Sequence, residues 1–269
     1  MQVYNRLPLL TAQPSDEDRQ KAPHLLYGVL EAGDPCSAAR WRGMALEEIE
    51  KLLSDGKTPV IAGGTGFYIT ALLDGLSPVP DVPGGVREKI AAMQKEMGNP
   101  AFHAAFAEID PVMAAKLDPY NTQRVVRAWE VLEGTGKSLA EWQALPRETP
   151  PAHLKFFTIT LLPPREKLHA QCDARFDAMI KAGAPDEARA FMDDMEAGRI
   201  PKTAALANAL GYPELAAHLQ GRDTLEHAAE LAKISTRQYA KRQSTWFRNQ
   251  ITPDLRLETA DVEAVLRAI

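Results

Sequence analysis

The segment from Val60 to Tyr68 (Val-Ile-Ala-Gly-Gly-Thr-Gly-Phe-Tyr) constrains the fold more than any other part of the chain. An apolar run breaks into a glycine-rich turn with one hydroxyl, which predicts a strand, a tight turn and a helix. In α/β sheets, ligands bind beyond the carboxyl ends of the strands, where glycines let backbone N–H groups approach a phosphate. A turn without a ligand fits the same residues, because a lone Gly-Gly-Thr-Gly is weak support for any particular ligand.

The elements around this segment predict a parallel α/β sheet. A helix is expected from Ser37 to Asp55, followed by a short buried strand from Thr58 to Ala62 and a helix from Phe67 to Leu73. This alternation is typical of a sheet whose strands run parallel. Further strands are expected at 156–162 and 255–257, and further helices at 165–182, 186–197, 213–219, 224–247 and from 261 onward.

A block between two proline-rich loops has no strand character. The first loop, Ser77 to Gly85, holds three prolines and two glycines, and a second loop spans Pro146 to Pro151. Everything between them is expected to be helical. The sequence therefore predicts an α/β core made of residues 1–82 and 152–269, interrupted by a helical insertion at 83–151.

Composition excludes several classes of protein. With 269 residues, 45% hydrophobic and 25% charged, the chain is expected to be a soluble globular enzyme. We expect a cytoplasmic location, since no stretch approaches the roughly 20 apolar residues of a membrane span and no leader peptide is recognisable. Cys36 and Cys172 stand alone and the six histidines are scattered, so neither a disulfide framework nor a zinc site is expected.

Basic residues gather on the predicted helix near the carboxyl end, although the net charge of the chain is −5. Between Leu231 and Gln250 there is no acidic residue, and the basic ones are Lys233, Arg237, Lys241, Arg242 and Arg248. Lys233, Arg237 and Lys241 recur every four residues and share one face. Basic side chains interleaved with Tyr239 and Trp246 favour binding of looped or single-stranded RNA. A solvated helix face anchored by Trp246 is the alternative.

The helical block carries a second candidate RNA contact between Asn121 and Trp129. Arg124 and Arg127 lie three residues apart, hence on one helix face, next to Gln123, whose amide can read a base edge. The arginines are equally placed to pair with glutamates at 130 and 133 along the same helix. Spacing alone leaves both roles open.

Taken in order along the chain, these motifs resemble those of bacterial tRNA dimethylallyltransferases. The resemblance spans nearly the whole chain and rests on Met1-Gln2-Val3-Tyr4, Thr11-Ala12 with Pro14, Gly63 to Tyr68, Leu76-Ser77-Pro78, Asn121 to Arg127, Gly211-Tyr212, and Lys241 to Arg248. It implies a P-loop NTPase-like parallel sheet with a helical insertion that binds the anticodon stem-loop. It also implies transfer of a dimethylallyl group from dimethylallyl diphosphate to N6 of the adenosine 3′-adjacent to the anticodon.

The resemblance assigns roles residue by residue. Thr65 is implied as a catalytic residue, and Gly63, Gly64 and Thr65 as the diphosphate-binding turn. Mg²⁺ is implied as a cofactor, and the full-length enzyme is expected to be a monomer. The implied tRNA-binding residues are Met1, Gln2, Gln123, Arg124, Val125, Val126, Arg127, Lys241, Arg242, Gln243, Ser244, Thr245, Trp246, Phe247 and Arg248.

The sequence also departs from this family. Relatives begin with a strand, a Gly-x-x-x-x-Gly-Lys-Ser/Thr loop and a second strand ending in Asp-Ser, which would all precede Met1. The loop that binds phosphate, the hydroxyl that binds Mg²⁺ and the aspartate implied as general base are thus expected upstream, and the first strands of the sheet are expected to be missing. Asn208 stands where some relatives have an arginine. We therefore expect residues 1–269 to bind RNA better than they catalyse, and to associate through an exposed sheet edge.

Two other functions fit parts of the sequence. An adenylate isopentenyltransferase, acting on a free nucleotide, would share the glycine turn but would need neither the helical insertion nor the basic helix. A noncatalytic RNA-binding protein would need the basic helix but no reaction site.

Overall fold

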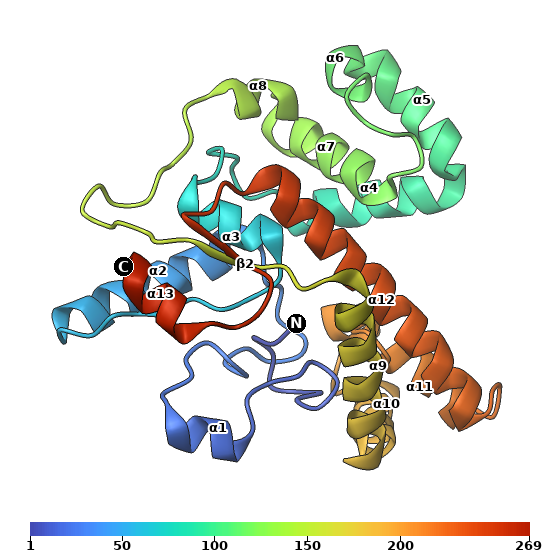
Figure 1. Cartoon of the computed structure of the whole chain (residues 1–269). Helices are drawn as coiled ribbons and strands as arrows, with labels where there is room; N and C mark the ends of the chain where they lie inside the picture. Colours follow the sequence, from blue (N-terminus) through green and yellow to red (C-terminus); the bar gives the residue numbers. More distant parts are fainter. The chain divides into compact units, whose positions relative to one another are not determined.

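A computed structural model describes residues 1–269, which divide into two compact units. The first unit comprises Met1–Leu72 and Leu154–Ile269, and the second comprises Leu73–His153. The sequence predicted the boundaries between residues 82 and 83 and between residues 151 and 152. The first predicted boundary therefore lies ten residues too late, and the second lies two residues too early. Figure 1 shows the helices of the second unit, α4 to α8, as one continuous group along the chain.

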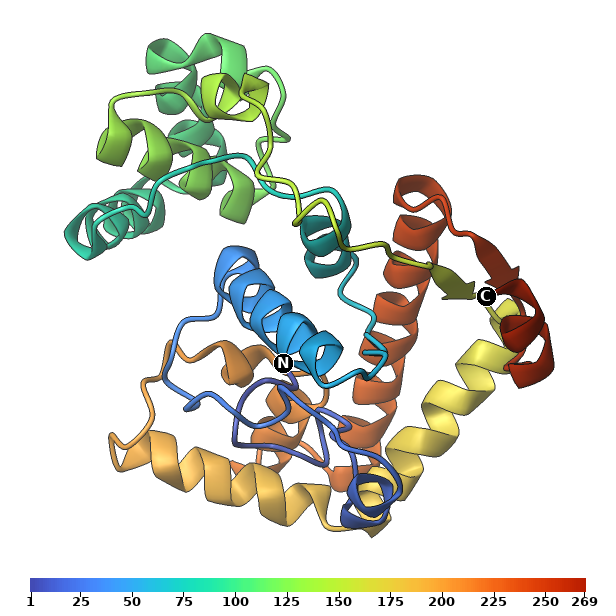
Figure 2. The same ribbon diagram turned by 90° about the vertical axis from the view of Figure 1, so that its left-hand side faces the viewer.

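The first unit holds most of the helices and both strands. Its helices are α1 (Asp16–Lys21), α2 (Ala38–Ser54), α3 (Gly66–Leu73), α9 (Arg165–Lys181), α10 (Ala184–Glu196), a 3₁₀ turn (Ala205–Asn208), α11 (Tyr212–Leu219), α12 (Leu225–Gln250) and α13 (Val262–Ala268). Helix α12 packs along α9 and α11, as both views show (Figures 1 and 2). Side-chain oxygens of Ser37, Thr224 and Asp261 accept backbone N–H groups and so fix where α2, α12 and α13 begin.

The sheet consists of two strands, β1 (Ile159–Leu161) and β2 (Leu255–Leu257), which run parallel with Ile159 opposite Leu255. The predicted parallel pairing and the bounds of the terminal strand are confirmed. The predicted strand at 156–162 is shorter than expected, because its partner offers only three residues for pairing.

The predicted strand from Thr58 to Ala62 is wrong. These residues form no strand, and the Val60 side chain is 88% exposed. An apolar segment becomes a strand only where a neighbour accepts and donates its backbone hydrogen bonds, and none of the strands or isolated bridges involves this segment. The apolar residues of this segment predicted a buried strand, but Val60 and Ile61 are exposed.

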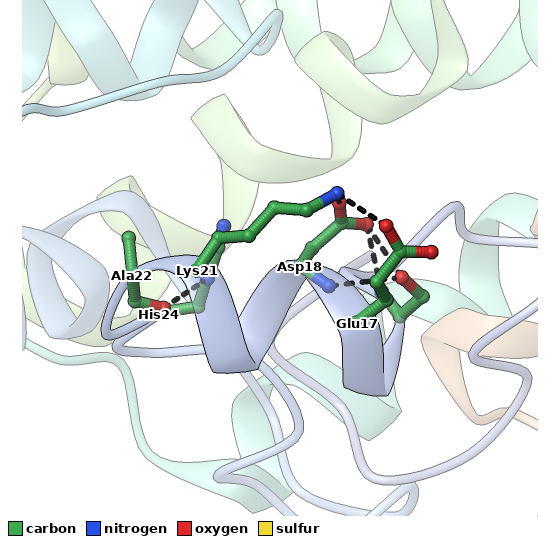
Figure 3. Close-up of polar contacts among 6 residues, drawn as sticks. Glu17, Asp18, Lys21, Ala22 and His24 are labelled. Atoms are coloured by element: carbon green, nitrogen blue, oxygen red, sulfur yellow. Dashed lines mark hydrogen bonds and ion pairs between the residues drawn. The ribbon is translucent and has the colours of Figure 1, made fainter.

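The sequence analysis also missed α1. Its start is fixed by a capping box, in which Ser15 accepts from the Asp18 backbone and Asp18 accepts from the Ser15 backbone. Figure 3 shows the polar contacts of this short helix: Lys21 Nζ lies 2.6 Å from a Glu17 carboxylate oxygen, and His24 Nδ1 lies 2.8 Å from the Ala22 carbonyl oxygen. The serine followed by three acidic residues was the available signal.

The core of the first unit joins its amino-terminal loop to the helices that follow β1. Tyr4, Leu7 and Leu10 are buried together with side chains of α9, α10, α11 and α12, including Phe191 and Leu215. This burial places residues 1–13 against helices that begin at Arg165 or later in the sequence.

The second unit is a helical bundle with its own core. It contains α4 (Gly84–Met97), α5 (Asn99–Ile109), α6 (Pro111–Ala114), α7 (Thr122–Thr135) and α8 (Leu139–Ala144). Phe102 and Phe106 pack on Trp129, with ring centroids 4.6 and 5.6 Å apart. Helix α7 ends where Gly136 adopts a left-handed conformation, with φ of 69°. The expected block of helices without strands is what the structure contains.

Candidate functional site

The glycine turn at residues 63–66 leads directly into α3. The Thr65 carbonyl accepts hydrogen bonds from the Tyr68 and Ile69 backbone N–H groups at 2.9 and 3.2 Å, which starts the helix. The Thr65 side chain is exposed, and its hydroxyl makes no hydrogen bond within the chain. The turn thus presents one free hydroxyl and the amino-terminal end of a helix to solvent.

Two of the turn's three glycines are required by contacts with α12. Gln243 Nε2 donates to the Gly64 carbonyl at 2.8 Å, and a Cβ on Gly64 would lie 3.0 Å from Gln243 Cδ, with the amide nitrogen closer still. A Cβ on Gly66 would lie 2.7 Å from Trp246 Cγ. Around Gly63 the space is open to 4 Å. Packing against α12 therefore explains why glycine stands at positions 64 and 66, but it does not explain Gly63.

An open groove of about 580 Å³ runs along the last turns of α12. Its lining is amphipathic and basic, and consists of Gln238, Lys241, Arg242, Thr245, Trp246, Asn249 and Gln250. Trp246 belongs to both features, since it packs against Gly66 and lines the groove. The Arg242 guanidinium lies over the Tyr239 ring, 5.6 Å from its centroid. The glycine turn and the basic end of α12 therefore adjoin through Trp246 and Gln243.

The earlier part of the basic stripe has a structural role. Lys233 Nζ lies 2.7 Å from an Asp177 carboxylate oxygen and 2.8 Å from one of Glu230, and Arg237 Nη1 lies 2.6 Å from one of Asp173. The hydrogen bond with Asp177 raises the pKa of Lys233 above its usual value. Because Asp173 and Asp177 belong to α9, the charges of Lys233 and Arg237 are paired with a neighbouring helix, although both residues share the helix face that the sequence predicted.

The segment from Lys241 to Arg248 is only partly available for contacts. Lys241 and Arg242 are exposed and take part in no ion pair. The hydroxyls of Ser244 and Thr245 donate to carbonyls four residues earlier in the helix, both at 3.0 Å. Gln243 is engaged with Gly64. The free polar groups at this end are therefore chiefly cationic.

Tyr68, in the first turn of α3, packs against neighbouring parts of the first unit. The Tyr68 hydroxyl donates to the Cys36 carbonyl at 2.9 Å, and its ring packs on Trp41 with centroids 5.3 Å apart. Burial raises the pKa values of Tyr68 and Tyr4, with Cys36 close to both, so both phenols stay neutral at neutral pH. The Tyr68 contacts connect α3 to α2 and to the residues just before it.

The amino-terminal loop carries the predicted residues Met1 and Gln2, and a carboxylate from α10 holds it in place. Glu187 accepts the backbone N–H groups of Leu9 and Leu10 at 2.8 and 3.0 Å, and burial raises its pKa. Gln2 Nε2 donates to the Ala12 carbonyl at 2.7 Å, which closes the loop on itself. Sequence reasoning missed Glu187, because nothing local links it to residues almost 180 positions away.

The second unit carries the other predicted cluster, around the start of α7. Gln123 and Arg124 are exposed, and Arg124 takes part in no ion pair, whereas Arg127 Nη1 lies 3.7 Å from a Glu130 carboxylate oxygen. Val125 is 1% exposed and Val126 packs on the same hydrophobic core. The side chains of both valines therefore help to stabilise the unit.

The structure contains no group of three or more acidic, histidine or cysteine side chains that could hold a metal ion. At the glycine turn the available groups are a hydroxyl and backbone amides, which suit the oxygens of an anion better than a cation. None of the helices combines the length and the apolar character that a membrane span requires.

Comparison with known proteins identifies the family. The sequence pattern of the family described as IPP transferase matches residues 2–250. The chain belongs to this family. It is 47% identical over 269 residues to a protein named tRNA dimethylallyltransferase from Paramagnetospirillum magneticum, covering 100% of this chain and 84% of the relative. A protein of the same name from Rhodospirillum centenum is 47% identical, covering 97% of this chain and 82% of the relative.

Solved structures of family members share the fold. The tRNA isopentenylpyrophosphate transferase from Bacillus halodurans is 28% identical with a TM-score of 0.64, covering 99% of this chain and 82% of its own. The Staphylococcus epidermidis enzyme of this type is 29% identical with a TM-score of 0.62, covering 99% and 85%. A eukaryotic dimethylallyltransferase acting on tRNA, at 24% identity and a TM-score of 0.73 over 92% of this chain, agrees in fold. The predicted α/β, P-loop-like fold and the predicted family are both confirmed.

Proposed function

We propose that this IPP transferase family member is a prenyltransferase that moves a dimethylallyl group from dimethylallyl diphosphate to tRNA. The acceptor is N6 of the adenosine immediately 3′ of the anticodon. One observation carries the proposal: the turn that suits a diphosphate and the basic end of α12 that suits RNA touch through Gln243 and Trp246. The names of the relatives at 42–47% identity support the same reaction.

The chemistry explains why these two features should adjoin. An exocyclic adenine amine is a poor nucleophile, because its lone pair is delocalised into the ring, so the allylic carbon must become cation-like as the diphosphate leaves. Charge on the leaving group needs donors placed where it develops. In this proposal Gly63, Gly64 and Thr65 contact the diphosphate, and the free Thr65 hydroxyl lies in the path between leaving group and amine.

The remaining proposed contacts hold the RNA. At the surface of the first unit, Lys241, Arg242 and Arg248 supply positive charge, and the amino-terminal residues Met1 and Gln2 add further contacts. In the second unit, Gln123, Arg124 and Arg127 bind the anticodon stem-loop. The target base must leave its stack to react, which costs a few kcal/mol and costs less in a loop than in a duplex.

Other parts of the proposal concern the ion, the location and the assembly. We propose that Mg²⁺ accompanies the diphosphate. No residue is assigned to the ion, because the side chains present do not form a metal site, and no proposed step depends on it. We propose a cytoplasmic location and a monomeric full-length enzyme.

RNA binding by the chain of residues 1–269 tests the first half of the proposal. An anticodon stem-loop should bind with a salt dependence that indicates several phosphate contacts. The double change Lys241→Glu with Arg242→Glu should weaken binding at least tenfold and flatten the salt dependence. Arg19→Glu with Lys21→Glu changes the net charge equally on the exposed helix α1 and serves as the matched control. Equal affinity for both double variants would remove the α12 groove from the interface.

Acceptor choice tests the second half. The protein is offered dimethylallyl diphosphate with either the stem-loop or AMP, and prenylated adenosine is measured by mass spectrometry. Transfer to the stem-loop supports the proposal. Transfer to AMP alone would favour an adenylate isopentenyltransferase, and tight stem-loop binding without any transfer would favour a noncatalytic RNA-binding protein.

A further inference from the structure

Tyr120 is an exposed aromatic side chain on a unit whose other large rings are buried or half-buried. Its side chain is 74% exposed, whereas Phe102, Phe106 and Trp129 form the core of the same bundle. An exposed tyrosine ring leaves a flat apolar face in water without any packing partner, which is the arrangement that proteins use to stack nucleobases.

The backbone that carries this ring forms a defined turn. Asp118 Oδ1 accepts the Tyr120 backbone N–H at 2.9 Å, and the Asp118 carbonyl accepts the Asn121 N–H, also at 2.9 Å. Pro119 restricts the backbone between them. Asn121 then caps α7. Exposure of the ring is therefore built into a defined turn, and stacking on it would cost little conformational entropy.

A polar recess adjoins the ring. It measures about 440 Å³ and is lined by Asp118, Tyr120, Asn121, Thr122 and Gln123. Amides, a hydroxyl and a carboxylate are the groups that pair with the edges of bases, and a flat base can lie on the ring while its edge meets them.

Positive charge lies one helical turn away. Arg124 follows the recess directly, is exposed and makes no ion pair, and Arg127 is only loosely paired. Aromatic stacking, base-edge groups and phosphate-binding charge thus occur together within ten residues of one unit, Asp118 to Arg127.

We propose that Tyr120 is a stacking platform for one unpaired base of the RNA substrate, whose edge is read by Gln123 and its neighbours in the recess. This inference rests on the proposed function, because it requires that RNA is the substrate. It adds a contact that specifies a base to the charge contacts of Arg124 and Arg127.

Binding of the anticodon stem-loop to variants of the 1–269 chain tests the proposal. Tyr120→Ala should weaken binding by about 5- to 100-fold, the range expected from loss of one stacked base, without changing the salt slope. Tyr120→Phe and Tyr120→Trp keep a stacking face and should bind within threefold of the wild type. Arg124→Gln should instead reduce the salt slope by about 0.7 to 0.9. Val112→Ala, which truncates another exposed apolar side chain of the same unit, is the matched control and should change nothing.

A fluorescent base gives a second readout. With 2-aminopurine placed at each loop position in turn, one position should be quenched on binding to the wild type and to Tyr120→Trp, and should brighten with Tyr120→Ala. Wild-type binding with no loss for Tyr120→Ala, or equal loss for Val112→Ala, overturns the stacking role and leaves the proposed function intact. Absence of wild-type binding to the stem-loop overturns both.

Discussion

Substituting the three glycines of the turn one at a time should produce three different results. Gly63→Ala should leave the free energy of unfolding unchanged or raise it by up to about 1 kcal/mol, because its surroundings are open and alanine restricts the unfolded chain. Gly64→Ala should cost about 1 kcal/mol, since the flexible end of Gln243 can move aside at the expense of one hydrogen bond.

Gly66→Ala should be the most damaging. Its Cβ would meet the body of the Trp246 ring, 2.7 Å from Cγ, which cannot swing away without moving the whole side chain. Overpacking of this kind costs about 1–3 kcal/mol, and an alanine at the first position of α3 recovers less than about 1 kcal/mol of helix propensity. We expect a net loss of about 1–2 kcal/mol.

Urea denaturation followed by circular dichroism measures this series. In a double-mutant cycle, Trp246→Leu should relieve the cost of Gly66→Ala, so the double variant should be more stable than the sum of the single changes predicts. Titration with inorganic pyrophosphate separates packing from ligand binding: Gly63→Ala should weaken pyrophosphate binding while leaving stability intact. The reasoning fails if Gly66→Ala is as stable as the wild type, or if Gly63→Ala is the least stable of the three.

Three further predictions concern the rest of the first unit. Glu187→Ala should lower the free energy of unfolding by about 1–3 kcal/mol at pH 7, because two backbone N–H groups lose their acceptor; an unchanged urea midpoint would contradict this. Burial raises the pKa of Glu187 above its usual value, so protonation of Glu187 favours the folded state. As pH falls through this raised pKa, the free energy of unfolding of the wild type should therefore rise relative to that of Glu187→Gln, and the difference should disappear as pH rises again. Arg237→Gln should leave RNA affinity and its salt slope unchanged, since Asp173 already holds the guanidinium, and filter binding showing a tenfold loss would return it to the interface. The chain of residues 1–269 should associate as its concentration rises, and Val60→Ser should reduce the association in light scattering; a monomer at every concentration would argue against an adhesive apolar surface.

Helices were predictable where local residues decide them. Ser37, Thr224 and Asp261 each cap the helix that the sequence expected to begin there, because an N-cap depends on residues within one turn. The strand at 255–257 was also predicted, although nothing local specified that β1 is its partner. In contrast, the strand expected at 58–62 failed, since strand formation depends on a neighbour that no local pattern specifies.

The candidate site was predictable only in part for the same reason. The glycine turn and the basic helix were both visible in the sequence, but their contact through Gln243 and Trp246 was not. Helical spacing put Lys233 and Arg237 on one face without revealing that α9 supplies aspartates to that face. Local patterns thus located the charged groups, and tertiary packing decided which of them remain free.

Mapping the modified nucleoside in tRNA tests the central claim most directly. The protein is incubated with dimethylallyl diphosphate and a tRNA that carries adenosine 3′ of its anticodon, and the digested nucleosides are analysed by mass spectrometry. The account predicts one N6-dimethylallyl adenosine, at that position alone, and none when a guanosine replaces it. Modification at another position, or an unmodified tRNA after binding has been demonstrated, would contradict it.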